Sequence, residues 1–154
     1  MNQDLQINIR EMNEKDLDEV YKIELSSFSD PWEISSFKED LNRKNAKSLV
    51  IEVENKIVGY IIFWIISDEI HILNIAVHRL YRKQKIATAL LKYCFEFASL
   101  KSFKYCTLEV RENNLSAQKL YEKFGFKPLY KRKKYYSCGE DAVVMGIELC
   151  DTMK

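Results

Sequence analysis

The stretch that most constrains this chain spans residues 70–91, where a strand pattern, a short basic loop and the start of a helix follow one another. Apolar side chains recur at near-alternate positions in its first part, as in a strand with one buried face: Ile70, Ile72, Ile75 and Val77. The alternation slips by one position between Ile72 and Ile75, which predicts a β-bulge. An amphipathic helical pattern then begins at Ile86.

The loop between the strand and the helix reads Arg79-Leu80-Tyr81-Arg82-Lys83-Gln84-Lys85. A basic loop that leads into a helix N-terminus suits a bound phosphate, because free backbone N–H groups and the positive end of the helix dipole face the same point. The alternative is a solvated basic turn, which is the usual fate of such a run.

Composition narrows the class of protein. A chain of 154 residues with 47% hydrophobic and 31% charged residues is expected to fold as one soluble globular domain. The net charge of +1 gives no reason to expect nucleic-acid binding. We see no signal peptide or membrane-length apolar run, and we read the four cysteines as reduced thiols of a cytoplasmic protein: Cys94, Cys106, Cys138 and Cys150.

The remaining patterns predict a mixed α/β fold. Strands are expected at residues 5–10, 48–53, 57–66, 70–77, 104–110, 126–136 and 142–149. Helices are expected after Asn13, from about Trp32 to Leu41, from Ile86, and from Leu115 to Phe124. This order favours a mostly antiparallel central sheet of about seven strands with helices on both faces, a bulged central strand, and parallel pairing across the helical crossovers.

Three features together resemble the GNAT acetyltransferases. The loop Arg82–Ala87 is similar to that superfamily's pyrophosphate loop, (Q/R)-x-x-G-x-(G/A), and the order of elements matches the GNAT fold over nearly the whole chain. The stretch Leu108–Asn114, with Ala117, Tyr121 and Phe124-Gly125-Phe126, resembles the branch that acetylates protein N-termini.

Further segments resemble the RimI-type members of that branch, which acetylate the N-terminal alanine of a small-subunit ribosomal protein. These segments are Asp30-Pro31-Trp32, Asn74–Val77, and Tyr135-Tyr136 with Glu140-Asp141-Ala142. The resemblance implies acetyl-CoA as co-substrate, a ribosomal-protein N-terminus as acceptor, no metal, and no membrane partner.

One residue departs from the family pattern. Lys85 stands where the loop usually has glycine, and none of the four glycines in the chain lies in this loop. Glycine permits a positive φ and a close backbone approach. We therefore expect Lys85 either to adopt ordinary helical dihedral angles or to carry strain.

Acetyl transfer to an amine needs a neutral amine and a proton donor for the departing thiolate. A protein α-amine has a pKa of about 7.7–8.0, against about 10.4 for lysine, so an N-terminus loses its proton more readily. The resemblance assigns the general base to Glu109, and we expect partial burial to raise its pKa. It assigns the general acid to Tyr121. From pattern alone, Glu109 is a solvent-facing strand residue and Tyr121 a core aromatic.

The resemblance also distributes the binding residues. It assigns the cofactor to Ile75, Ala76, Val77, Arg82, Lys83, Gln84, Lys85, Ile86, Ala87, Thr88 and Asn114. The first three would offer backbone groups to the pantetheine arm and the loop would hold the pyrophosphate. Asn114 is equally well explained as a helix N-cap. Trp32, Tyr135 and Tyr136 are assigned to the acceptor groove, and each could simply be a packing residue.

His71 and His78 have no partner at ligand or triad spacing, so we give them no role, and no cysteine has an adjacent base. Direct attack of the amine in a ternary complex is therefore expected. Two alternatives remain open: a GNAT enzyme for a small-molecule amine, and a non-catalytic acyl-CoA-binding regulatory domain, towards which Lys85 points.

Overall fold

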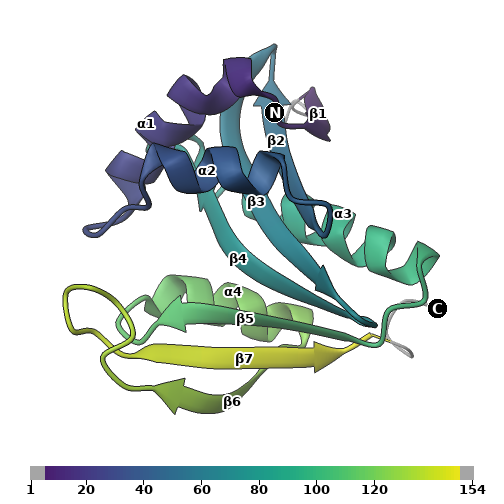
Figure 1. The fold of residues 1–154 in the computed structure, drawn as a ribbon, viewed down its shortest axis with the longest axis vertical. Coiled ribbons are helices and arrows are strands. Elements are labelled where there is room, and N and C mark those ends of the chain that lie inside the picture. The colour runs from purple at the N-terminus through teal and green to yellow at the C-terminus, as the bar shows by residue number, and fades with distance from the viewer. Residues whose placement is uncertain (1–5, 150–154) are drawn as a thin grey trace. The chain divides into compact units, whose positions relative to one another are not determined.

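The computed structural model describes residues 6–149, and Figure 1 follows its elements along the chain. The strands are β1 (Ile7–Glu11), β2 (Ala46–Val53), β3 (Lys56–Ile66), β4 (Glu69–Val77), β5 (Tyr105–Arg111), β6 (Lys127–Arg132) and β7 (Ala142–Glu148). The helices are α1 (Leu17–Ser27), α2 (Ile34–Leu41), α3 (Ile86–Leu100) and α4 (Leu115–Phe124), with short 3-10 helices η1 (Glu14–Asp16) and η2 (Arg79–Tyr81).

The hydrogen-bonded strand order is β1-β2-β3-β4-β5-β7-β6. The β4–β5 pair is parallel, whereas β1–β2, β5–β7 and β6–β7 are antiparallel. The predicted α/β fold with a mostly antiparallel sheet of seven strands is confirmed, including the parallel pairing across a helical crossover.

Several predicted boundaries shift. The expected strand at 5–10 appears as β1, which begins at Ile7, and Leu5 lies outside the described residues. The helix expected from Trp32 begins at Ile34, because the Trp32 N–H donates to the Glu24 carboxylate and is held outside the helix. The strand expected at 126–136 is shorter: β6 covers only Lys127–Arg132, and residues 133–136 belong to the loop that follows it.

The central strand β4 explains the slip in its apolar pattern. The side chains of Ile70, Ile72, Asn74 and Ala76 are buried in unbroken alternation, while Ile75 is only half-buried. The buried face therefore shows no slip over these residues, and the bulge expected from the apolar pattern stays a prediction. A buried polar residue, Asn74, occupies the place where the pattern of apolar residues breaks, so the pattern does not require a bulge.

Two compact units make up the chain, one formed by the described residues up to 63 with 74–92, the other by 64–73 with 93–149. In the first unit, α1 and α2 pack on the face of β3 that carries Tyr60. Tyr60 donates a hydrogen bond to Glu24 of α1, and the ring of Phe37 in α2 lies 5.7 Å from the Tyr60 ring. Ile86 of α3 packs on the opposite face, against Gly59.

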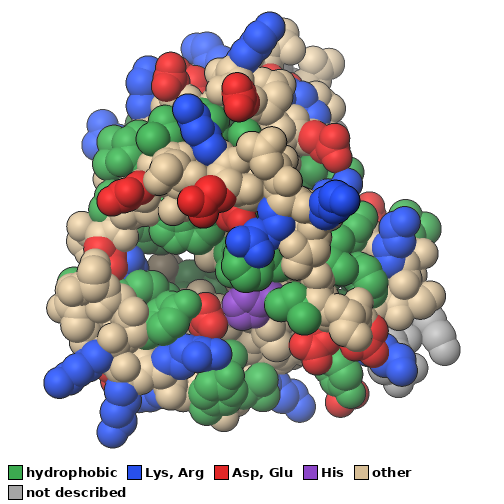
Figure 2. Space-filling view, in the orientation of Figure 1, with side chains coloured by type: hydrophobic (Ala, Val, Ile, Leu, Met, Phe, Trp, Pro, Cys, Tyr) green, Lys and Arg blue, Asp and Glu red, His purple; other side chains and the backbone are tan. Residues whose placement is uncertain are grey.

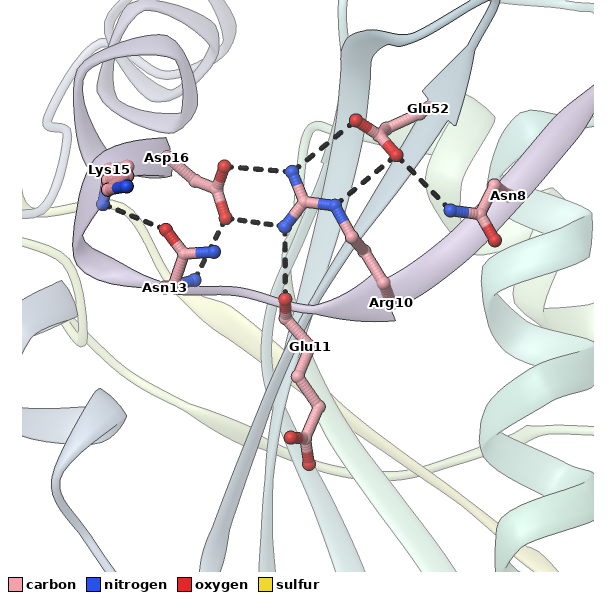
Figure 3. A network of polar contacts seen from close by, with 7 residues as sticks. All are labelled: Asn8, Arg10, Glu11, Asn13, Lys15, Asp16 and Glu52. Atoms are coloured by element: carbon pink, nitrogen blue, oxygen red, sulfur yellow. Dashed lines mark hydrogen bonds and ion pairs between the residues drawn. The ribbon is translucent and has the colours of Figure 1, made fainter.

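A polar network joins β1 to the start of α1 in the same unit (Figure 3). Arg10 donates to both carboxylate oxygens of Asp16, at 2.7 and 2.9 Å, and lies 3.2 Å from Glu52 on β2. Asp16 also accepts from the Asn13 N–H, which completes a capping box. The predicted N-cap at Asn13 is confirmed, and η1 precedes α1 because this box tightens the first turn.

In the second unit, helices cover one face of β5. Cys106 of β5 is buried beside Cys94 of α3. The Phe95 ring lies 5.5 Å from the Phe124 ring and 5.8 Å from the Phe126 ring. Helix α4 ends at Gly125, whose φ of 104° is the left-handed conformation expected for its C-cap. The opposite face of β5 carries Tyr105, Thr107 and Glu109, as the alternation predicts.

Charged side chains of both signs are spread over the face shown in Figure 2, with Lys and Arg prominent along the lower margin over β6 and the following loop. Within residues 6–149, no helix is long and apolar enough to cross a membrane. Cys94, Cys106 and Cys138 are free thiols, as expected, and Cys150 lies outside the described residues.

Candidate active site

A half-buried carboxylate, Glu109, is the centre of a polar cluster on the face of β5 that also carries Tyr105 and Thr107. Its Oε2 accepts a hydrogen bond from the Tyr135 hydroxyl at 3.0 Å and lies 3.5 Å from His71 Nε2. Its Oε1 lies 3.3 Å from Arg132 Nε. These four residues form the Glu109 cluster. Because the Glu109 side chain is only 12% exposed, fixed protein groups rather than bulk water surround most of its charge.

Strand register brings the cluster together. Parallel pairing sets His71 of β4 opposite Thr107 of β5, and antiparallel pairing through β7 sets Arg132 opposite Ala142, which is itself opposite Arg111. Directly opposite residues share a face of the sheet, and so do residues two apart on one strand. Arg132 therefore lies on the face of Glu109, two strands away.

The sequence analysis missed His71, because its partner is distant in the chain and only strand pairing brings the two together. His71 Nδ1 lies 2.7 Å from the Thr107 hydroxyl, while Nε2 faces Glu109. When the hydroxyl donates to Nδ1, a neutral ring carries its proton on Nε2, directed at the carboxylate. The interpretation that His71 has no partner is wrong, whereas His78 accepts from the Leu80 N–H and caps η2.

The pKa of Glu109 runs opposite to our expectation. Burial acts to raise the pKa, but the hydrogen bond and charge of His71, the Tyr135 hydroxyl and the charge of Arg132 together hold it below its ordinary value. His71 contributes charge only when its ring is protonated. The predicted raised pKa is therefore wrong, and Glu109 is a carboxylate anion at neutral pH.

Tyr121 is buried in the same unit, with its ring 5.8 Å from that of Phe126. Burial, and then the proximity of Tyr136, raise its pKa well above the ordinary value. The phenol therefore keeps its proton at any physiological pH. Packing in the core and holding a proton are compatible for this residue, as the sequence indicated.

The loop after β6 carries the two tyrosines assigned to the acceptor groove. Their rings meet edge to face at 5.1 Å, and the Arg111 guanidinium stacks 4.0 Å from the centre of the Tyr136 ring. Burial raises the pKa of Tyr136 to about 12. Tyr135 thus touches Glu109 directly, whereas Tyr136 is held by Arg111.

The segment assigned to the pantetheine arm lies at the end of β4 in the first unit. Ala76 and Val77 are buried, and Ile75 is half-buried. A Cβ added at Gly59 would lie 2.9 Å from the Ala76 carbonyl oxygen, so the glycine permits the close approach of β3 to this segment.

The basic loop combines an anchored arginine with two strained lysines. Arg82 donates from Nε to the Val77 carbonyl at 3.1 Å and from Nη2 to the Ser27 hydroxyl at 3.3 Å, so it fastens the loop to β4 and α1. Lys83 and Lys85 have φ values of 62° and 64°. Of the two conformations expected for Lys85, the structure has the strained, left-handed one that a glycine would adopt at lower cost.

Helix α3 begins at Ile86, directly after this loop, as predicted. The Ala89 N–H bonds back to the Lys85 carbonyl, which closes the first helical turn. The N–H groups of Ile86, Ala87 and Thr88 precede any intrahelical partner and are available at the positive end of the helix. Gln84 instead donates to the Leu80 carbonyl at 3.2 Å within the loop.

Comparison with known proteins identifies the fold. The model of the acetyltransferase (GNAT) family matches residues 17–126. This chain belongs to the GNAT acetyltransferase family. It is an acyltransferase enzyme, and the alternative of a non-catalytic binding domain is set aside.

Relatives of this GNAT enzyme bear the names of ribosomal-protein-alanine N-acetyltransferases and N-alpha-acetyltransferases. It is 41% identical over 143 residues to a Bacillus subtilis protein named as a candidate [ribosomal protein bS18]-alanine N-acetyltransferase, covering 92% of this chain and 95% of the relative. It is 35% identical to an N-alpha-acetyltransferase of Sulfurisphaera tokodaii, covering 92% of each. The ribosomal-protein-S18-alanine N-acetyltransferase of Escherichia coli superposes with a TM-score of 0.86 at 28% identity, covering 94% of each chain.

Two further predicted site residues of the GNAT enzyme have structural partners. Asn114 caps α4 by accepting from the Ala117 N–H at 3.2 Å, which confirms the N-cap interpretation. Trp32 packs its ring 5.2 Å from Phe37. Two assignments stay predictions: that Trp32 lines the acceptor groove, and that Asn114 contacts the cofactor.

Sequence reasoning also missed Glu24, a buried carboxylate of α1. Besides Tyr60, it accepts hydrogen bonds from Asn74 Nδ2 at 2.7 Å and from the Trp32 N–H at 2.8 Å. It therefore ties the segment before α2 to β3 and to the residue that precedes Ile75. Its apolar helical neighbours gave no signal that this acidic residue would face inward.

Proposed function

We propose that this GNAT enzyme transfers the acetyl group of acetyl-CoA to the α-amine of a protein N-terminus, the N-terminal alanine of a small-subunit ribosomal protein. The observation that carries the reaction is the Glu109 cluster, which holds an anion beside Tyr135 on the face of β5 opposite Cys106. The acceptor is supported by the relatives above, whose names specify a ribosomal-protein alanine or N-alpha-acetylation.

The donor half of the reaction falls to the first unit. Backbone groups of Ile75–Val77 would bind the pantetheine arm as a sheet edge binds an added strand. The N–H groups at the start of α3 would receive the pyrophosphate, with the charges of Lys83 and Lys85 nearby. Arg82 would act mainly by keeping this loop in place, because two of its nitrogen atoms already bind Val77 and Ser27.

The proton transfers fall to the second unit. Glu109 would hold the acceptor's ammonium group and take its proton, directly or through one water, as the nitrogen attacks the thioester carbonyl. The new C–N bond forms and the C–S bond breaks. Tyr121 would give its proton to the departing thiolate, and the phenol arrives at the reaction protonated.

The lowered pKa of Glu109 decides how this base can work. A carboxylate with a low pKa is a weak base but a good electrostatic partner for an ammonium ion. An α-amine with a pKa of about 7.7–8.0 needs little help to lose its proton near neutral pH, whereas a lysine amine with a pKa of about 10.4 needs much more. The Glu109 cluster thus favours an N-terminal acceptor.

The test is an acetylation assay with short peptides that differ only in their first residue. The wild-type enzyme with acetyl-CoA is expected to acetylate the peptide that begins with alanine at the highest kcat/KM. Tyr121→Phe should lower kcat while the protein stays folded, because the ring and its packing remain. Equal rates for all first residues would overturn the alanine assignment, and an unchanged kcat in Tyr121→Phe would overturn the acid.

A further inference from the structure

The two oxygen atoms of the Glu109 carboxylate have different kinds of partner. Oε2 is held by the Tyr135 hydroxyl at 3.0 Å and faces His71 at 3.5 Å. Oε1 faces the Arg132 guanidinium, 3.3 Å from its Nε. An incoming amine that pairs with Glu109 therefore meets Tyr135 and His71 at Oε2, but only the cationic Arg132 at Oε1.

Arg132 is more readily displaced from Glu109 than His71 is. It is the last residue of β6, an edge strand whose six residues are all exposed. Its side chain is 48% exposed, against 21% for His71, which is also fixed by Thr107. An ion pair with this much exposure contributes little to stability, so breaking it costs the fold little.

An acceptor's α-ammonium offers Glu109 the same chemistry as Arg132. Both groups are cations that donate N–H bonds to a carboxylate. A carboxylate that keeps Arg132 while it binds an ammonium ion would have to hold two like charges at one oxygen, which repel one another. The structure points to replacement of one cation by the other.

We propose that Arg132 occupies the position at Oε1 of Glu109 where the acceptor's α-ammonium group binds. Binding of the acceptor then displaces Arg132 from Glu109. This inference rests on the proposed function and deepens it, because it makes Arg132 a residue that sets affinity for a charged N-terminus. Before an acceptor binds, Arg132 pairs with the Glu109 carboxylate at 3.3 Å. Arg111, the other arginine on this face, is stacked 4.0 Å from the centre of the Tyr136 ring, whereas the Arg132 guanidinium lies farther from its rings, 5.7 Å from that of Tyr130 and 5.8 Å from that of Tyr135.

The test compares Arg132→Gln, Arg132→Lys and the matched control Lys133→Gln, which removes the same charge from the next residue. Calorimetry with CoA present measures the Kd of a short peptide that begins with alanine and of the same peptide acetylated at its N-terminus. Arg132→Gln should tighten binding of the free-amine peptide about two- to fivefold, the range of an exposed ion pair. The acetylated peptide should bind all four proteins alike, and Arg132→Lys and Lys133→Gln should resemble wild type.

A second measurement separates this role from a merely structural one. In the absence of substrates, the Glu109 carboxyl pKa followed by NMR should rise in Arg132→Gln and stay unchanged in Lys133→Gln, because only the first variant loses the facing charge. Weaker or unchanged binding of the free-amine peptide by Arg132→Gln would overturn the inference. The proposed function would stand in that case, provided that wild type still acetylates peptide N-termini. If wild type acetylates no N-terminus, both are wrong.

Discussion

At the scale of single residues, the chemistry depends on a carboxylate whose pKa is lowered rather than raised. The fold surrounds Glu109 with one hydroxyl, one imidazole and one guanidinium, and their combined effect exceeds that of burial. Partial burial was expected from the family resemblance, whereas the strand pattern alone predicted a solvent-facing side chain. The three partners were not, because each comes from a different segment and reaches Glu109 only through strand register or the loop after β6.

A pH profile of Glu109→Gln tests this assignment. Since the wild-type carboxylate is already ionised and binds the acceptor as an ammonium ion, kcat/KM should show no acidic limb near neutral pH and should fall only above the amine pKa of about 7.7–8.0. The variant loses the partner of the ammonium ion, so kcat/KM should drop roughly tenfold or more at every pH. An acidic limb that is present in wild type and absent from the variant would show that Glu109 itself titrates in this range.

The left-handed lysines give a prediction about stability. Lys85→Gly should raise the free energy of unfolding by about 1 kcal/mol, because glycine adopts the φ of 64° without the strain of a Cβ. Urea unfolding with an unchanged m-value measures this gain. Gln84→Gly, at a neighbouring position without a positive φ, is the matched control and should destabilise the protein. Equal effects of the two glycines would contradict a strained Lys85.

At the scale of elements, buried carboxylates tie the helices of the first unit to its strands. Glu24 joins α1 to β3, β4 and the segment before α2, and Asp16 joins η1 to β1. Helix positions were predictable from periodicity and from the caps at Asn13, Asn114 and Gly125. These polar ties were not, since acidic residues at the start of a helix are usually explained by the helix dipole alone.

The Arg10–Asp16 pair predicts how stability depends on pH. The hydrogen bond from Arg10 holds the pKa of Asp16 below its ordinary value near 3.8. The folded-state pKa is therefore lower than that of the unfolded chain, so the stabilisation is present above the ordinary value and is lost as pH falls through the folded-state value. Asp16→Asn should lower the free energy of unfolding by about 1–3 kcal/mol at neutral pH.

Urea unfolding at neutral pH and at a pH of about 2 measures this effect. The difference between wild type and Asp16→Asn should shrink at the lower pH, where the wild-type carboxylate is also protonated. Asp18→Asn, which removes an exposed charge two residues away, is the control and should change stability little. A difference that is the same at both pH values would mean that the ionised form of Asp16 contributes nothing.

At the scale of the whole molecule, the order of elements and the family could be predicted from the sequence. The side-chain contacts of the candidate site could not. The motif around Glu109 and Tyr121 pointed to an acetyltransferase, and the comparisons bear this out for the family. His71, Arg132 and Glu24 carry no motif of their own. Their importance comes from partners that lie far away in sequence.

The central claim is that this enzyme acetylates a protein α-amine, and a competition within one molecule tests it most directly. A short peptide that begins with alanine and contains one internal lysine is incubated with wild-type enzyme and acetyl-CoA at neutral pH, and tandem mass spectrometry locates the acetyl group. The account predicts acetylation at the α-amine, with loss of most of that product in Glu109→Gln. Acetylation at the lysine side chain alone would contradict it.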